Sequence, residues 1–194
     1  MSLTIIGLSG VARSGKDTVA NILVNDYGFT RYAFADKLKD AAYALDPLIV
    51  QNGSTTRLTT LVDHYGWESA KGNPEVRRTL QRMGSEAGWH IHGRHLWTSA
   101  LEHELDLAPQ QDRIVISDVR FPHEVKWITN FAHQSTMIHV TRSGIGRQLY
   151  GDNARHDSEQ YIPEDAHHID NNGSLDDLHA KVTAWADKTM RINA

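Results

Sequence analysis

The sequence predicts an α/β fold, with a doubly wound, mostly parallel sheet of about five strands flanked by helices. Short apolar segments rich in β-branched residues alternate with amphipathic segments of helical spacing along the chain. Turn residues separate these segments, and no internal repeat interrupts their order. Strands that alternate with helices imply right-handed crossovers and parallel strands, and such sheets bind ligands at the carboxyl ends of their strands.

The elements follow one another in a regular order. Strands are expected at 4–8, 29–34, 113–117, 136–141 and 168–170. Helices are expected at 17–26, 36–45, 75–87 and 95–107, after Pro122, and after the cap Ser174-x-x-Asp177. Residues 51–75 hold loop signals around one helix near 58–65. The polar, glycine-containing segment 142–165 is expected to be a loop or lid.

Composition excludes several classes of function. The 194 residues suit one globular domain, and the absence of cysteine excludes disulfides, zinc–thiolate sites and cysteine nucleophiles. The formal charge of −4 argues against a general nucleic-acid or membrane-surface partner. No apolar run approaches the roughly 18 residues of a membrane span, and the first residues do not resemble a signal peptide. We therefore expect a cytoplasmic protein without a membrane or nucleic-acid partner.

The segment Gly10–Lys16 fits the phosphate-loop pattern G-x-x-x-x-G-K. It follows an apolar strand and opens a helix, which is the context that this motif requires. Backbone N–H groups of such a loop surround phosphate oxygens, the helix N-terminus adds partial positive charge, and the lysine reaches the β- and γ-phosphates. The residues expected to contact the nucleotide phosphates are Gly10, Ala12, Arg13, Ser14, Gly15, Lys16, Asp17 and Thr18.

Three residues are candidates for binding magnesium. Asp17 stands where a hydroxyl residue usually binds Mg²⁺, and Thr18 follows it. Asp17 could equally be a favourable acid in the first turn of a helix. Asp118 ends the strand 113–117 and resembles the Walker B acid, although a helix N-cap is the alternative.

Arg120 is a candidate phosphate clamp, or a partner for Glu124 in a surface ion pair.

The motif set favours a small-molecule kinase among phosphate-loop proteins. No Asn-Lys-x-Asp guanine motif is present, and the chain is short for a motor. A kinase needs a second anion site and a lid that excludes water. Arg78, Gln81 and Arg82 could share one helical face, and the lid segment carries Arg142, Arg147 and Arg155. A solvated helix face and a solvated loop are the respective alternatives.

Several stretches in order resemble the bacteriophage deoxynucleoside monophosphate kinase family. They include LSGVARSGKDT, AFADKLKDA, EVRRTLQRMGSEA, ISDVRFPHE and IDNNGSLDDLHAKV, and together with shorter matches they cover most of the chain outside about 46–74. The resemblance implies a P-loop kinase that uses ATP and Mg²⁺ to convert deoxynucleoside monophosphates to diphosphates. It is also consistent with a homodimer, and with a location in the host cytoplasm if the protein is phage-encoded.

The resemblance also assigns roles to residues. It implies an acceptor-nucleotide region inserted at about 36–107 in a single kinase domain, and a lid at about 142–165. Its acceptor-site residues would be Lys37, Asp40, Arg77, Arg78, Gly84, Ser85, Trp97, Asp118, Arg120 and Glu124. The expected mechanism, in which positive charge neutralises the transferring group, makes Arg13, Lys16, Asp118, Arg120 and Arg142 the catalytic residues. Ala12 departs from relatives that have a basic residue there. The rival functions are a kinase of dephospho-coenzyme A or phosphomevalonate, and a non-catalytic ATP-binding protein.

Overall fold

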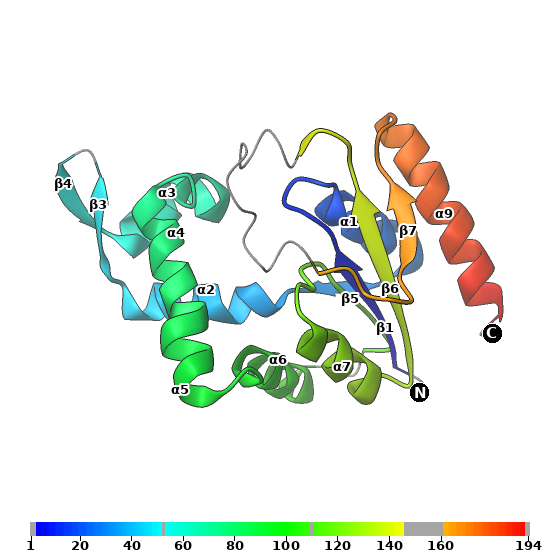
Figure 1. The fold of residues 1–194 in the computed structure, drawn as a ribbon, viewed down its shortest axis with the longest axis horizontal. Coiled ribbons are helices and arrows are strands. Elements are labelled where there is room, and N and C mark those ends of the chain that lie inside the picture. The colour runs from blue at the N-terminus through cyan, green and yellow to red at the C-terminus, as the bar shows by residue number, and fades with distance from the viewer. Residues whose placement is uncertain (1–2, 52, 109–110, 146–160, 193–194) are drawn as a thin grey trace. The chain divides into compact units, whose positions relative to one another are not determined.

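A computed structural model describes residues 3–51, 53–108, 111–145 and 161–192 (Figure 1). The chain divides into two compact units. The first unit combines Met1–Ala33 with Ala108–Ala194, and the second is Phe34–Leu107. The second unit therefore occupies nearly the same residues as the insertion expected at 36–107.

The first unit is built on a five-stranded sheet. Its strands are β1 (Thr4–Ser9), β2 (Thr30–Tyr32), β5 (Arg113–Ile116), β6 (Gln134–Thr141) and β7 (His167–Asp170). They lie in the order β2-β5-β1-β6-β7, and every neighbouring pair is parallel. The predicted parallel α/β sheet is confirmed. Because β1 lies between two strands that come much later in the chain, its carboxyl end is the switch point at which such sheets bind ligands.

Helices cover both faces of this sheet. On one face, Ile6 and Leu8 of β1 share a buried apolar cluster with α1 (Lys16–Tyr27) and α9 (Leu175–Ile192). Gly7 faces the other way, where a Cβ would meet Met137 of β6 and Ile128 of α7 (Pro122–Phe131). In Figure 1, α7 lies in front of the sheet while α1 lies behind it. This alternation is the doubly wound arrangement that the sequence predicts.

The second unit is mainly helical. Its elements are α2 (Phe34–Leu45), β3 (Leu48–Gln51), β4 (Ser54–Arg57), α3 (Leu58–Ala70), α4 (Pro74–Gln81), the π-helical η1 (Arg82–Trp89), α5 (His90–His92) and α6 (Leu96–Leu107). A separate apolar core joins α2, β3, α3 and α4 and consists of Ala42, Ile49, Leu58, Leu61, Ala70, Val76 and Leu80. No helix among the described residues is long and apolar enough to cross a membrane.

The expectation for residues 51–75 was wrong in part. β3 and β4 form an antiparallel hairpin. The helix expected near 58–65 is present, but α3 continues to Ala70 after a kink at Gly66, whose φ of 74° and ψ of 162° are not helical. The dipeptide Asn52-Gly53 was the missed signal, because Asn-Gly favours two-residue hairpin turns, and Gly53 has a φ of 80°. Ile49 is fully buried in the core of the second unit, so tertiary packing stabilises this short hairpin.

Other element boundaries also differ from the expectation. β2 spans only Thr30–Tyr32, and α2 begins at Phe34 instead of residue 36. The helix expected at 75–87 is α-helical only to Gln81 and then continues as the π-helix η1. Gly84 and Gly88 lie in η1, where Trp97 packs closely and donates its indole N–H to the Gly84 carbonyl at 3.2 Å. This packing is a long-range contact that helical periodicity does not reveal.

Candidate phosphate-transfer site

The loop between β1 and α1 has the backbone of an anion-binding turn. Gly10, Arg13 and Gly15 have φ values of 136°, 61° and 107°, all in the range that L side chains rarely adopt. Left-handed residues alternating with ordinary ones turn successive N–H groups toward one point. A non-glycine residue such as Arg13 in this conformation is uncommon and is found mainly at functional sites.

Both glycines of the motif are required by neighbouring protein atoms. A Cβ on Gly10 would overlap the carbonyl oxygen of Val140 in β6. A Cβ on Gly15 would overlap the side-chain nitrogen of Asn171, which follows β7. The loop therefore lies against the carboxyl ends of β6 and β7, and neighbouring protein atoms alone require both glycines.

Lys16 places a positive charge over the loop. Its Nζ donates to the carbonyl oxygens of Gly10 and Val11, each at 2.8 Å. The ammonium is thus held beside the loop whose backbone N–H groups turn toward one point. Of the other residues predicted to contact phosphate, Arg13 and Asp17 are exposed, and Thr18 is half-buried in the first turn of α1.

Backbone hydrogen bonds bring Asp118 to the same edge of the sheet as the loop. The Ser117 N–H donates to Tyr32 O at 3.0 Å, and the Val119 N–H donates to Leu8 O at 2.9 Å. Asp118 lies in the turn between these two anchors and is half-buried. The residue that caps α7 is Phe121, so the alternative of Asp118 as a helix N-cap was wrong.

Glu124 is buried beside this turn and has only 6% of its surface exposed. Its Oε2 accepts hydrogen bonds from the backbone N–H groups of Arg120 and Phe121, at 2.6 and 3.0 Å. The expected alternative of a surface Arg120–Glu124 ion pair is therefore wrong, because the Glu124 carboxyl is buried and accepts its hydrogen bonds from backbone N–H groups. Burial first, and then the negative charge of Asp118, raise the pKa of Glu124 to about 8, against the opposing effect of the two N–H donors.

This raised pKa predicts a pH-dependent stability. The native state holds the Glu124 proton more tightly than the unfolded chain, so the free energy of unfolding should fall as pH rises from about 4.5 to about 8. The upper limit of this loss is about 5 kcal/mol. Glu124→Gln removes the titration and should flatten the profile, as measured by urea unfolding at intervals across this pH range.

A matched control for this prediction is Glu164→Gln, which removes an exposed carboxyl from the same unit. The control should keep the wild-type pH profile. A Glu124→Gln profile with the same slope as the wild type would show that Glu124 does not titrate in this range.

Residues expected on the acceptor side lie in the second unit. Lys37 pairs with Asp40 at 2.8 Å and with Glu104 at 3.1 Å, and the hydrogen bond to Asp40 is the main cause of a raised Lys37 pKa.

The other expected acceptor-site residues of this unit lie on or near α4 and η1. Trp97 donates its indole N–H to the carbonyl of Gly84. The Ser85 hydroxyl donates to the Gln81 carbonyl at 2.7 Å, and Arg77 and Arg78 are exposed on α4. The structure thus groups Lys37 with Asp40 and Trp97 with Gly84, and their substrate roles stay predictions.

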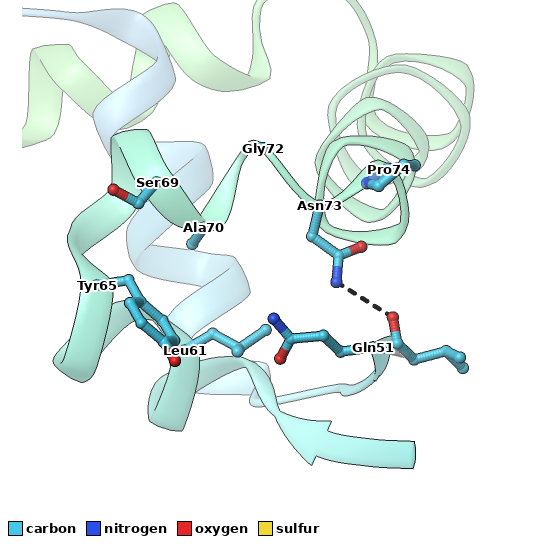
Figure 2. A pocket seen from close by; sticks show the side chains of 9 residues that line it. Gln51, Leu61, Tyr65, Ser69, Ala70, Gly72, Asn73 and Pro74 are labelled. Atoms are coloured by element: carbon cyan, nitrogen blue, oxygen red, sulfur yellow. Dashed lines mark hydrogen bonds between the residues drawn. The ribbon is translucent and has the colours of Figure 1, made fainter. Parts of the chain in front are cut away.

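A pocket of about 450 Å³ lies wholly within the second unit (Figure 2). It is formed by β3, α3 and the turn before α4, and none of the predicted site residues lines it. Asn73 occupies one wall, where its amide donates to Val50 O at 3.1 Å and accepts from the Glu75 N–H at 2.8 Å. Asn73 therefore caps α4 and joins it to β3.

Only the beginning and the end of the predicted lid can be placed. Arg142 is exposed just after β6, and the N–H of the next residue, Ser143, donates to Asn172 Oδ1 at 2.6 Å. Residues 146–160, which include Arg147 and Arg155, lie outside the described residues. The assignment of Arg142 as a catalytic residue stays a prediction.

Two buried polar residues near the loop, His139 and Asn171, were not predicted from the sequence. His139 of β6 forms a hydrogen bond with Ser9 at 2.9 Å, and its pKa is lowered by burial and by the nearby His168 and Lys16. Asn171 donates its side-chain N–H to Ser14 O at 2.8 Å. The stretch IDNNGSLDDL contains Asn171. The contact with Ser14 cannot be seen in the sequence, where Asn171 is one of two asparagines in a turn.

The described residues contain no group of three or more histidine and acidic side chains arranged to hold a metal ion. Magnesium commonly takes one or two protein oxygens and completes its shell with water and substrate phosphates. Asp17, Thr18 and Asp118 therefore stay predictions for such a site.

Comparison with known proteins identifies the family. The model of the deoxynucleotide monophosphate kinase family matches residues 4–69 and 67–182. The chain belongs to this family. A deoxynucleotide monophosphate kinase of Escherichia phage RB69 is 31% identical over 246 residues, covering 93% of this chain and 98% of the relative. The enzyme of the same name from Enterobacteria phage T4 is 49% identical over 43 residues, 22% of this chain and 18% of the relative.

A solved structure supports the fold of this kinase. A sugar kinase from Janibacter sp. HTCC2649 superposes with a TM-score of 0.50 at 12% identity, covering 96% of this chain and 95% of the other. At that identity the likeness shows a shared kinase fold and nothing about the substrate. The resemblance drawn from the sequence motifs is confirmed, and the protein is a kinase of the nucleotide-kinase type.

Proposed function

We propose that this kinase transfers the γ-phosphoryl group of ATP to a deoxynucleoside monophosphate. The observation that carries the proposal is the left-handed loop Gly10–Lys16 with the Lys16 ammonium held over it. Its place at the carboxyl end of β1 and the family match over most of the chain support the same conclusion.

The loop and its lysine would act on the phosphates of ATP. The converging N–H groups hold the phosphate oxygens, and Lys16 exchanges its bonds to two carbonyl oxygens for a stronger one to phosphate. Arg13, Arg120 and Arg142 are exposed, so their charges carry no desolvation penalty in this structure. They would neutralise charge on the transferring phosphoryl group. The acceptor phosphate is already a nucleophilic oxyanion, so orientation and electrostatics carry the reaction.

The residues near the loop fit a magnesium ion. Asp118 lies at the same edge of the sheet as the loop, and carboxylate oxygens are ligands that Mg²⁺ takes from proteins. Asp118, with Asp17 or Thr18, would hold Mg²⁺. The ion would supply charge neutralisation at the β- and γ-phosphates.

The acceptor nucleotide would bind to residues of the second unit. Lys37, Arg77 and Arg78 offer positive charge for its phosphate, and Trp97 offers an aromatic face near Gly84 and Ser85. Lys37 is held by two carboxylates, so the acceptor phosphate would have to replace at least one of them.

A substrate panel tests this function. ADP release with ATP and Mg²⁺ should be fastest, in kcat/KM, with one or more deoxynucleoside monophosphates, by at least about tenfold over dephospho-coenzyme A or phosphomevalonate. Ribonucleotides in the same panel determine the sugar preference. Preference for a non-nucleotide acceptor would contradict the proposal, and ATP binding without acceptor-stimulated ADP release would indicate a non-catalytic protein.

A further inference from the structure

Asn171 connects the phosphate loop to the last strand of the sheet. It lies between β7 and α9, and 8% of its surface is exposed. Its backbone N–H donates to Thr141 O at 2.8 Å, which fixes it against the end of β6. Its side-chain N–H donates to Ser14 O at 2.8 Å, inside the phosphate loop. A buried amide is therefore held by the sheet and in turn holds one carbonyl of the loop.

The planarity of the peptide bond gives this contact a consequence for the nucleotide. The described residues contain no cis peptide bond, so the Ser14 carbonyl and the Gly15 N–H point in opposite directions. Because Asn171 holds the carbonyl toward itself, the Gly15 N–H is directed away from Asn171. Rotation of this peptide would cost the buried hydrogen bond.

Gly15 and Asn171 also fit each other sterically. A Cβ on Gly15 would overlap the Asn171 side-chain nitrogen, and Gly15 has a φ of 107°. Any larger residue at position 15 would displace the amide from Ser14. The glycine of the motif thus allows the asparagine to reach the loop.

We propose that Asn171 is a positioning residue, which orients the Gly15 N–H toward the nucleotide phosphates before ATP binds. The expected effect on KM for ATP rests on the proposed function. The orientation of the loop rests only on the contacts described above. Asn171 acts through the Ser14–Gly15 peptide and is assigned no contact with the substrate.

Asn171→Leu tests this role, because leucine has the same branched arrangement of heavy atoms and no hydrogen-bond donor. The loss of one preorganised N–H contact should raise KM for ATP about tenfold and leave kcat within about twofold. Asn172→Leu is the matched control in the same turn, since Asn172 bonds to Ser143 and Asp170 rather than to the loop. It should change KM for ATP less than twofold.

Val182→Ala separates positioning from a general loss of stability. Val182 is fully buried on α9, so its truncation lowers the unfolding midpoint without touching the loop. At a temperature where both variants are folded, Val182→Ala should keep the wild-type KM for ATP. An equal rise of KM in Val182→Ala and Asn171→Leu would reduce Asn171 to a structural residue and overturn the inference.

Amide hydrogen exchange without nucleotide gives a readout that does not depend on activity. Residues 10–16 should exchange faster in Asn171→Leu and at the wild-type rate in Asn172→Leu. If the wild-type protein neither binds ATP nor transfers phosphate, the proposed function fails while this exchange result still decides the orientation of the loop. Unchanged exchange in Asn171→Leu, or an unchanged KM in an active enzyme, would overturn the inference.

Discussion

Replacing Lys16 with methionine should lower the rate of phosphoryl transfer by about 10²- to 10³-fold. Methionine keeps much of the length of the side chain but removes the ammonium that Gly10 and Val11 hold over the loop. Charge on the phosphates grows as the reaction proceeds, so the lysine contributes more in the transition state than in the ground state. The loss should therefore appear mainly in kcat, measured as ADP release at saturating substrates.

The control for this prediction is Lys126→Met. Lys126 is exposed on α7 and has the same charge, so its loss tests whether a general decrease in positive charge slows the enzyme. The control should retain wild-type kcat. Transfer by Lys16→Met within about tenfold of the wild type would remove the phosphate loop from the mechanism.

Gly10→Ala should destabilise the protein by at least about 3 kcal/mol and abolish most of its activity. Two effects add at this position. A φ of 136° is strained for any L side chain, and the new Cβ would overlap the backbone oxygen of Val140 in a central strand. Backbone atoms of a sheet cannot move aside as the end of a flexible side chain can. The loop must therefore shift, and urea unfolding measures the cost.

Gly28→Ala is the matched control, because Gly28 ends α1 in the left-handed conformation with a φ of 69° and has open space around it. Only backbone strain of about 1 kcal/mol is expected there, with activity unchanged. If Gly10→Ala and Gly28→Ala lost equal stability, the collision with Val140 would not be the reason for a glycine at position 10.

Residues close together in the chain determined most of what could be predicted. The loop from Gly10 to Lys16 was identified because a strand, a glycine-rich turn and a helix follow one another directly. The position of Asp118 followed from the apolar strand before it, since parallel strands end at one edge of the sheet. Alternating elements were enough for the fold class, and several motifs in order were enough for the family.

The hairpin β3–β4 and the π-helix η1 show where local patterns failed. Each is stabilised by residues distant in sequence: Ile49 by the core of the second unit, and Gly84 by Trp97. Residues 48–57 carry a hairpin signal in Asn52-Gly53, but short strands of this kind form only when a core covers one face.

The sequence by itself determined the class of fold, the phosphate loop and the acid at the edge of the sheet, because each depends on periodicity or on adjacent residues. Only the tertiary structure decided which atoms surround the loop. Ser14 and Asn171 are 157 positions apart. The burial of Glu124 beside Asp118, and its raised pKa, likewise depend on how the chain packs around the turn. Hydrogen bonds and burial of this kind arise from contacts across the fold, which no local pattern of residue types specifies.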